Sequence, residues 1–263
     1  MADRLQWITV QPKTWADWSP SRGGLEAHAL VADRYRDAPP FVIEQDPALA
    51  ARTASALSVP WWSARRWKGA RARFDAAPEQ GVDMLWANMA LHMAADPQSL
   101  IADWHRRLAT DGFLMFSCFG PDTLRELRGL YQRLGWPAAA HEFTDMHDWG
   151  DMLVGAGFAE PIMDMERIVL TWATPEAALA ELRGLGRNLH PGRFPALRGR
   201  RWHSELRAAL AGLATPDRDD GRIALSFEII YGHAFKPPPR IALSGESAVS
   251  LRQMREMLQR GRP

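Results

Sequence analysis

Cysteine and long apolar runs are both scarce in this chain of 263 residues, and each scarcity excludes a class of protein. A single cysteine, Cys118, excludes a disulfide framework and a thiolate metal site. Its apolar neighbours favour a small buried side chain over a reactive nucleophile. No apolar run approaches the roughly 18 residues that a membrane-spanning helix needs. The first residues, MADRLQWITVQP, lack the apolar core of a signal peptide. We therefore expect a cytoplasmic protein without a membrane segment.

An excess of charge of one sign is also missing, since 32 Lys and Arg residues stand against 31 Asp and Glu residues. Two segments are nevertheless basic. Residues 183–207 hold seven arginines and one acid, Glu205, and residues 65–73 hold five Lys or Arg and no acid. Such segments are either solvated surface or a docking surface for an acidic partner, because complementary charge raises the encounter rate. A nucleic acid is unlikely as that partner, because Phe194 and Trp202 are too few aromatics for a base-stacking platform.

Residues 82–123 read as a strand, a helix and a second strand. An apolar run over 82–87 ends at Asn88, an amphipathic helix is expected over about 97–109, and a second apolar run covers 113–119. Two apolar strands joined by such a helix are the βαβ unit of a parallel sheet. Ligands of these sheets bind beyond the carboxyl ends of the strands, so we expect the site near Asn88 and the loop 119–123. With 46% hydrophobic and 24% charged residues, the chain predicts one large α/β domain.

Capping residues and apolar patterns place the remaining elements. Asp46-Pro47, Asp96-Pro97 and Thr174-Pro175 each combine an N-cap residue with proline at the first helical position. Thr123 and Glu126 form a candidate capping box. The other expected elements are a strand over 41–45, a helix over 147–156, a strand over 167–173, helices over 175–186 and 199–212, a strand over 223–235 and an amphipathic segment over 251–258.

Several segments carry a resemblance to a known family. "VDMLWANMALHM" (82–93) is similar to the fourth strand of class I S-adenosylmethionine-dependent methyltransferases. Four further segments, in the right order, resemble the malonyl-acyl-carrier-protein O-methyltransferases of biotin synthesis: "FGPDTLRELR" (119–128), "FTDMHDWGDMLVGAGFAEPIMDMERIVLT" (143–171), "LRGLGRN" (182–188) and "EIIYGHAF" (228–235). The resemblance covers most of the chain from about residue 40.

This resemblance implies a fold, a reaction and a partner. The fold is a Rossmann-like α/β fold with a seven-stranded, mostly parallel sheet whose last strand is antiparallel. The reaction is transfer of a methyl group from S-adenosylmethionine to the free carboxylate of malonyl on an acyl carrier protein. Residues 175–213 are expected to form a helical insertion or lid within a single domain, 1–263. Because an acyl carrier protein is acidic, residues 183–207 are its expected docking segment.

The cofactor site that the resemblance implies is altered at its glycine-rich turn. The family pattern Asp-x-Gly-x-Gly-x-Gly falls on Asp17 to Gly23, and Gly24 follows. Ser19 and Ser21 replace two glycines, which removes freedom at positive φ. The turn either has another shape that still accepts the cofactor, or the fold survives with cofactor binding weakened or lost. The expected cofactor-binding residues are Asp17, Ser19, Ser21, Gly23, Gly24, Glu44 and Asn88.

Glu44 matches the acid that binds the ribose hydroxyls in the family, although a glutamate at a strand end can also simply face water. Asn88 either bonds the cofactor and shapes the floor of its pocket or caps the loop.

Methylation of a carboxylate needs orientation and exclusion of water rather than a strong base, because the nucleophile is already ionised. The resemblance suggests Phe119, Gly120, Asp122, Arg128 and Tyr231 as substrate-binding residues, and Arg125 and His147 as groups that orient the substrate. Two of these assignments have a plainer interpretation. A helical arginine usually forms a surface ion pair, and beside His147 either Asp145 or Asp148 can simply cap the next helix. His92, His190 and His233 have no metal-ligand spacing and are read as solvated or core histidines.

Two rival functions remain open at this point. One is a non-catalytic relative that keeps the fold and binds a carrier protein or another partner. The other is a methyltransferase of a different small acid or of RNA, which strongly salt-dependent RNA binding would favour.

Overall fold

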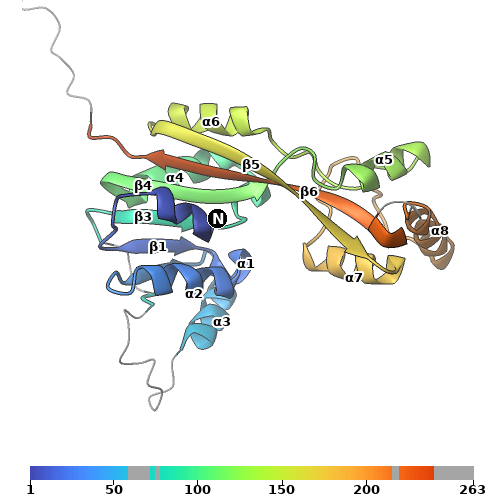
Figure 1. Cartoon of the computed structure of the whole chain (residues 1–263), viewed down its shortest axis with the longest axis horizontal. Helices are drawn as coiled ribbons and strands as arrows, with labels where there is room; N and C mark the ends of the chain where they lie inside the picture. Colours follow the sequence, from blue (N-terminus) through green and yellow to red (C-terminus); the bar gives the residue numbers. More distant parts are fainter. Residues whose placement is uncertain (59–71, 75–77, 215–218, 240–263) are drawn as a thin grey trace, which may run out of the picture.

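The computed structural model describes residues 1–58, 72–74, 78–214 and 219–239, and within them six strands form one sheet in the order β2-β1-β3-β4-β6-β5 (Figure 1). The strands are β1 (Trp15–Trp18), β2 (Pro40–Ile43), β3 (Val82–Ala87), β4 (Leu108–Phe119), β5 (Ala159–Trp172) and β6 (Ile223–Phe235). The pairs among β1 to β4 are parallel, whereas β6 runs antiparallel to β4 and β5. The predicted α/β fold with an antiparallel last strand is confirmed.

The predicted count of seven strands is wrong for the part of the chain that the structure describes. At the free edge of β2, the described residues form one isolated parallel bridge, between Phe41 and Arg73. The Val42 nitrogen donates to the Arg73 carbonyl at 2.7 Å, and the Arg73 nitrogen donates to the Pro40 carbonyl at 2.8 Å. A single bridging residue makes no ladder, so within the described residues this edge of the sheet has a bridge and no further strand.

Helices cover both faces of the sheet. They are α1 (Pro20–Gly23), α2 (Leu25–Arg34), α3 (Pro47–Leu57), α4 (Pro97–Arg107), α5 (Arg125–Arg133), α6 (Met146–Gly155), α7 (Pro175–Gly184) and α8 (Arg200–Ala211), with 3-10 helices η1 (Ala2–Trp7), η3 (Leu91–Met93) and η4 (Asp219–Gly221). Trp104 of α4 and Trp149 of α6 pack in the core on one face, and Leu5 of η1 and Val31 of α2 pack on the other. All four residues of β1 are buried, as expected of a parallel strand covered on both sides.

Three helix starts predicted from the sequence are confirmed. The side chains of Asp46, Asp96 and Thr174 accept the backbone N–H groups of Ala48 at 2.8 Å, Ser99 at 3.0 Å and Ala177 at 3.3 Å. The helices that these residues cap are α3, α4 and α7. None of the described helices combines the length and the apolar character that crossing a membrane requires.

The predicted capping box is wrong. Leu124, with φ 56°, precedes α5, and Thr123 and Glu126 both bond to β6 instead. The Thr123 hydroxyl donates to the Glu228 carbonyl at 3.1 Å, and the Glu126 carboxylate accepts the hydroxyl and the N–H of Ser226 at 2.6 and 2.9 Å. These bonds fasten the loop 119–124 to the neighbouring strand, which is a tertiary contact that local spacing cannot reveal.

A small lobe is built around the far ends of β5 and β6, where α5, α7 and α8 gather (Figure 1). It has an apolar cluster of its own, which includes Leu127, Trp172, Leu206, Leu210 and Phe227. The two helices expected over 175–186 and 199–212 are α7 and α8, and both belong to this lobe. That this segment acts as an insertion or lid stays a prediction. The amphipathic segment predicted over 251–258 lies outside the described residues.

Candidate functional site

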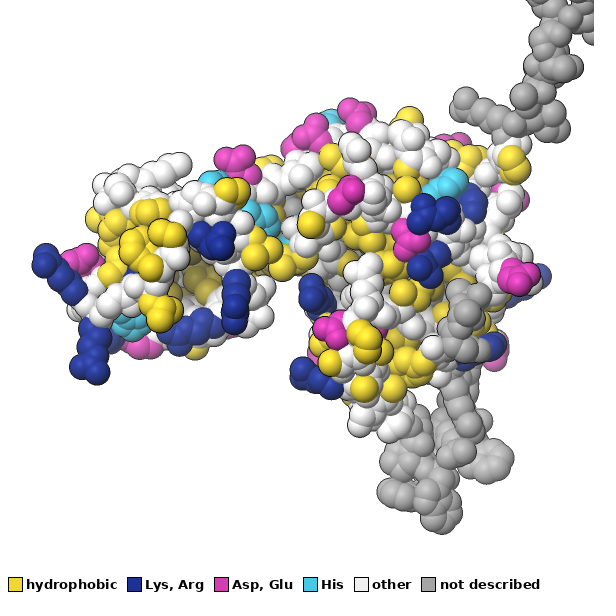
Figure 2. Space-filling view, turned by 180° about the vertical axis from the view of Figure 1, so that it is seen from behind, with side chains coloured by type: hydrophobic (Ala, Val, Ile, Leu, Met, Phe, Trp, Pro, Cys, Tyr) yellow, Lys and Arg dark blue, Asp and Glu magenta, His cyan; other side chains and the backbone are white. Residues whose placement is uncertain are grey.

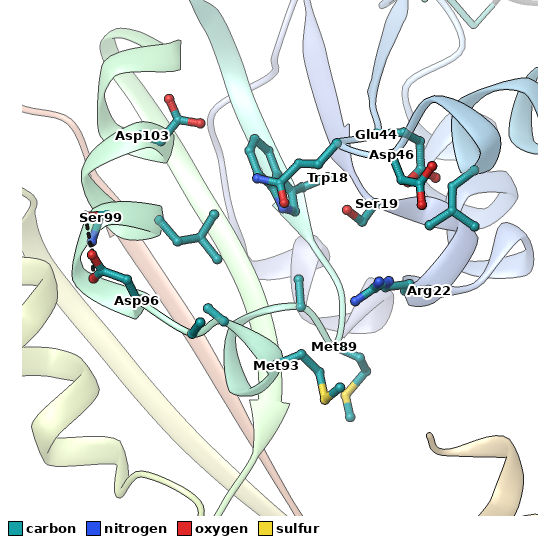
Figure 3. Close-up of a pocket in the computed structure, with 16 residues that line it drawn as sticks. Trp18, Ser19, Arg22, Glu44, Asp46, Met89, Met93, Asp96, Ser99 and Asp103 are labelled. Carbon is teal, nitrogen blue, oxygen red and sulfur yellow. Dashed lines mark hydrogen bonds between the residues drawn. The ribbon is translucent and has the colours of Figure 1, made fainter. Parts of the chain in front are cut away.

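A cavity of about 340 Å³ lies at the carboxyl ends of β1, β2 and β3 (Figure 3). It is lined by Trp18, Ser19, Arg22, Glu44, Gln45, Asp46, Leu49, Met89, Ala90, Met93, Ala94, Ala95, Asp96, Ser99, Leu100 and Asp103. Glu44 and Asp46 lie close to Ser19, and Met89 and Met93 lie together at another side of the space (Figure 3). This is the edge of the sheet at which the βαβ pattern placed the site.

Glu44 has one carboxylate oxygen in use and one without a partner. Its Oε1 atom accepts the Ser21 N–H and the Thr53 hydroxyl, each at 2.9 Å. Its Oε2 atom is buried and has no hydrogen-bond partner among the described residues. Because an unpaired buried acceptor costs about 1–3 kcal/mol, Oε2 is suited to accept a donor from a molecule in the cavity.

The turn after β1 is a short helix in place of a glycine loop. Ser19 takes the left-handed conformation, φ 55° and ψ 53°, and so adopts the positive φ that its replacement of glycine was expected to prevent. Its carbonyl accepts the N–H groups of Arg22 and Gly23, both at 2.9 Å. Ser21 lies inside α1, where positive φ is not needed, and points its N–H at Glu44. The altered sequence therefore forms a turn of another shape, a short helix held by backbone hydrogen bonds.

Gly23 is the position where close approach is required. A Cβ atom at Gly23 would lie 2.7 Å from the carbonyl oxygen of Asn88, which is too near for any larger residue. The Asn88 amide nitrogen donates to the Gly23 carbonyl, and its amide oxygen accepts the Ser117 hydroxyl at 2.7 Å. Asn88 therefore joins α1, β3 and β4 behind the cavity and is not among the lining residues. Gly24, with φ 98°, connects α1 to α2.

Asp17 lies inside the sheet and not in the cavity. The residue is 2% exposed, and its Oδ2 atom lies 2.8 Å from Nδ1 of His28 on α2. Burial raises the pKa of Asp17, and the hydrogen bond to His28 opposes that shift. Of the seven residues predicted to bind cofactor, Ser19 and Glu44 line the cavity. The other five are not among the lining residues: Asp17, Ser21, Gly23, Gly24 and Asn88.

A second, smaller cavity of about 140 Å³ adjoins the first, and Met93 lines both. Its walls are largely apolar: they comprise His92, Met93, Phe119, Thr123, Leu124, Leu127, Ala139, Ala140, His141, Phe143, Leu182, Leu185, Gly186, Arg187 and Asn188. Phe119, one of the predicted substrate residues, is among them. Gly120 and Asp122 are not: Gly120 leaves room for the Glu228 side chain, and Asp122 pairs with Arg167 at 2.5 Å and Arg125 at 3.4 Å.

Arg125 and Arg128 line a third space, an open groove of about 530 Å³ along α5. Arg125 is paired with Asp122 and with Glu126, and Arg128 donates to the Pro121 carbonyl. The groove shares Ala139 and Ala140 with the second cavity, so the three spaces follow one another across the molecule. Arg128 was predicted to bind the substrate and Arg125 to orient it, but neither is among the lining residues of the second cavity.

His147 and Tyr231 lie away from all three spaces. His147 is in the first turn of α6, with its side chain 80% exposed and its Nδ1 atom 2.8 Å from Asp145, which caps that helix. Tyr231 lies on β6 beneath Arg4 of η1, whose guanidinium is 3.8 Å from the ring centroid, and its hydroxyl donates to Glu166 at 3.2 Å. Neither position brings a side chain to the cavities. No cluster of metal-ligating residues occurs within the described ranges.

Several lining residues were not predicted from the sequence. Arg22, Asp46, Met89, Met93 and Asp103 line the first cavity, and His92 and His141 line the second. Asp46 and Met89 could have been predicted, because they follow the ends of β2 and β3, where ligands of such sheets bind. Arg22 depends on the unexpected helical turn, and His141 depends on a loop that comes back from elsewhere in the chain.

Comparison with solved structures identifies the class of fold. Over 90% of this chain and 99% of the other, the structure is similar to that of a candidate methyltransferase of Bacillus halodurans, with a TM-score of 0.56 and 16% identity. The [4+2]-cyclase SpnF is similar over 90% of this chain and 81% of that one, with a TM-score of 0.50 and 16% identity. The fold is that of class I methyltransferases, and the cyclase illustrates that this fold alone does not fix the reaction.

Comparison with curated proteins is more specific. The malonyl-acyl-carrier-protein O-methyltransferase of Gallionella capsiferriformans is 35% identical over 95% of this chain and 86% of that protein. The protein of the same name from Laribacter hongkongensis is 36% identical over 91% of this chain and 81% of that protein. A scan against family models finds no match. From these relatives, the chain belongs to the malonyl-acyl-carrier-protein O-methyltransferase family.

Proposed function

We propose that this protein methylates the free carboxylate of malonyl on an acyl carrier protein, as part of biotin synthesis, with S-adenosylmethionine as methyl donor. The observation that carries the proposal, beside the family, is the contact of two cavities at Met93. The larger cavity fits a cofactor at the strand ends, and the smaller one fits a short acyl group. When bound, S-adenosylmethionine supplies an electrophilic methyl group to the acceptor.

The residues of the larger cavity fit that cofactor. The Oε2 atom of Glu44 has no hydrogen-bond partner among the described residues, and a ribose hydroxyl of the cofactor would supply one. Glu44, Asp46 and Asp96 outnumber the single basic residue of the described lining, Arg22, and this negative charge favours a cationic ligand. Asp103 is instead paired with Arg106 and Arg107. Arg22, the basic side chain among the lining residues, is suited to the methionine carboxylate.

The smaller cavity serves to hold the acceptor and exclude water. Its aromatic and aliphatic walls remove bulk water from the carboxylate, which makes the nucleophile more reactive toward a methyl cation equivalent. Leu182, Leu185 and Arg187, at and after the end of α7, form part of those walls. This supports the proposal that the 175–213 segment covers the acceptor.

We assign carrier-protein docking to the arginine-rich segment 183–207. Arg183, Arg187, Arg193 and Arg200 are exposed, and no ion pair engages them within the described part of the chain. Figure 2 shows dark blue side chains along the small lobe, across a hollow from the body of the molecule. An acidic carrier protein at this lobe would deliver its acyl group toward the second cavity.

The test is methyl transfer to malonyl–carrier protein, followed by intact-protein mass spectrometry, with acetyl–carrier protein as the matched acceptor that lacks a carboxylate. The proposal expects one added methyl on the malonyl form and none on the acetyl form. Failure to methylate malonyl–carrier protein by a protein that binds S-adenosylhomocysteine would favour a different acceptor. An RNA that is methylated in its place would assign the protein to the second rival.

A further inference from the structure

The small cavity beside Met93 has few polar side chains that remain available to a ligand. Those that line it are His92, Thr123, His141, Arg187 and Asn188. Thr123 is engaged with the backbone of Glu228 at 3.1 Å in both directions. Asn188 donates to the Ala138 carbonyl at 2.7 Å and accepts the His190 N–H at 2.9 Å. Arg187 is largely exposed, and the two histidines are the other polar groups left for a ligand in the cavity.

His92 is held in one orientation and one tautomer. Its Nδ1 atom accepts the Phe119 N–H at 3.4 Å, which places the ring proton on Nε2. The ring lies 4.6 Å from that of Phe119 and 6.0 Å from that of Phe143, centroid to centroid. The backbone of β4 and two aromatic side chains therefore fix the direction of the remaining N–H group.

His141 has a polar atom that the protein leaves unused. Its Nε2 atom is buried and has no hydrogen-bond partner among the described residues. Its ring lies 4.5 Å from that of Phe143, so both histidines contact the same aromatic side chain. Since an unpaired buried polar atom is costly, a ligand atom is the natural partner for this nitrogen.

We propose that His92 and His141 bind the carboxylate of the malonyl group through their Nε2 atoms, with the ring proton of His141 also on Nε2, and so select a carboxylate-bearing acyl chain at this site. The inference rests on the proposed function, which it deepens by naming the residues that recognise the acceptor. A carboxylate entering an apolar cavity loses its hydration, and two N–H donors replace part of it.

A neutral donor such as His92 suits this reaction better than an arginine. Burial, together with the nearby His141, lowers the pKa of His92 to about 4, so the ring is uncharged at neutral pH. The other titratable side chains that line the cavity are those of His141 and of Arg187, which is exposed. A neutral N–H orients the carboxylate with a hydrogen bond. An ion pair with arginine would bind the attacking oxygen more tightly and so make it a weaker nucleophile. The methyl ester carries no charge, so the same donors bind it more weakly and favour its release.

The test compares binding of malonyl-pantetheine with binding of its methyl ester, by calorimetry, in the presence of saturating S-adenosylhomocysteine. The wild-type protein is expected to prefer the carboxylate by about 10- to 100-fold, the effect of hydrogen bonds to a charged group. His92→Leu and His141→Leu each remove about tenfold of that preference, and His92→Gln, which keeps a neutral donor, retains most of it. His203→Leu, on α8 outside the cavity, is the matched control.

The outcomes separate the two claims. Affinity for S-adenosylhomocysteine, measured for every variant, reports that the fold and the larger cavity are intact. Unchanged carboxylate preference in both leucine variants, with wild-type turnover of malonyl–carrier protein, overturns the inference and leaves the proposed function in place. A wild-type protein that neither prefers the carboxylate nor methylates malonyl–carrier protein overturns both.

Discussion

The Oε1 atom of Glu44 lies 2.9 Å from the backbone nitrogen of Ser21, so the acid at the end of β2 fixes the turn that follows β1. Ser21 stands where the family pattern has a glycine, and its N–H group is the one that Glu44 binds. The other oxygen of the same carboxylate is buried and has no hydrogen-bond partner among the described residues. One side chain thus stabilises the altered turn and, in the proposed function, supplies an acceptor for the cofactor.

Replacement of Glu44 by glutamine should weaken cofactor binding more than it weakens the fold. The amide oxygen can still accept from Ser21 and Thr53, but the free carboxylate acceptor becomes an amide nitrogen that cannot accept a ribose hydroxyl. We expect affinity for S-adenosylhomocysteine to fall by about tenfold or more, measured by calorimetry. Glu79→Gln, at an exposed position, is the control. Equal loss of affinity in the two variants would contradict this role for Glu44.

Gly23→Ala should destabilise the protein by about 1–3 kcal/mol, because the new methyl group would meet the backbone of Asn88. Gly129→Ala, in the middle of α5, is the matched control, since its Cβ would meet only the flexible end of Arg133 at 3.5 Å. That change should instead stabilise by up to about 1 kcal/mol, as helical alanine does. Urea unfolding measures both, and a neutral Gly23→Ala would show that α1 does not press against Asn88 as described.

The neutral His92 should make the protein less stable in acid. Its pKa is about 4 in the folded state against an ordinary 6.5, so between these values the unfolded chain binds more protons than the folded one. Stability is therefore full above pH 6.5 and falls as the pH drops toward 4, by on the order of 2–3 kcal/mol for this group.

His92→Gln removes that part of the pH dependence. Burial also lowers the pKa of His233 and of His105, so an acid dependence in the same direction remains in the variant. Urea unfolding at several pH values compares the two proteins. Parallel stability curves for wild type and variant would mean that His92 is not buried in its neutral form.

Charge reversal on the small lobe should impair use of the carrier protein and spare small acceptors. Arg193→Glu combined with Arg200→Glu is expected to raise KM for malonyl–carrier protein by about 3- to 10-fold at low salt, and less as salt screens the charges. KM for malonyl-pantetheine should not change. Arg36→Glu, an exposed arginine after α2, is the control. If KM for both acceptors rises together, the arginines act on the acyl site and not on the carrier protein.

The sequence predicted those parts of the fold that local pattern determines. The βαβ unit over residues 82–123 and three capped helix starts follow from apolar runs and from short motifs, whereas the antiparallel last strand was predicted from the family resemblance. The capping box failed because Thr123 and Glu126 find partners on β6, about a hundred residues away in the chain. The strand count failed at the sheet edge, where Phe41 and Arg73 form a bridge without a ladder.

The candidate site was predicted where it depends on strand ends and missed where it depends on returning loops. Glu44 and Phe119 follow directly from the ends of β2 and β4, and both line cavities. His141 comes from the loop between α5 and α6, so its place beside His92 is decided by packing among Phe119 and Phe143. Arg125 was predicted to orient the substrate. It lies instead along the outer groove, where it forms ion pairs with Asp122 and Glu126.

The most direct test of the central claim is calorimetric titration of the wild-type protein with S-adenosylhomocysteine, because the claim depends on a working cavity beside the serine-containing turn. We predict saturable binding with one site per chain and micromolar affinity, about 8 kcal/mol in free energy. Absence of binding at about millimolar ligand, where the free energy would be weaker than about 4 kcal/mol, would contradict the account and leave a family member that has lost its cofactor.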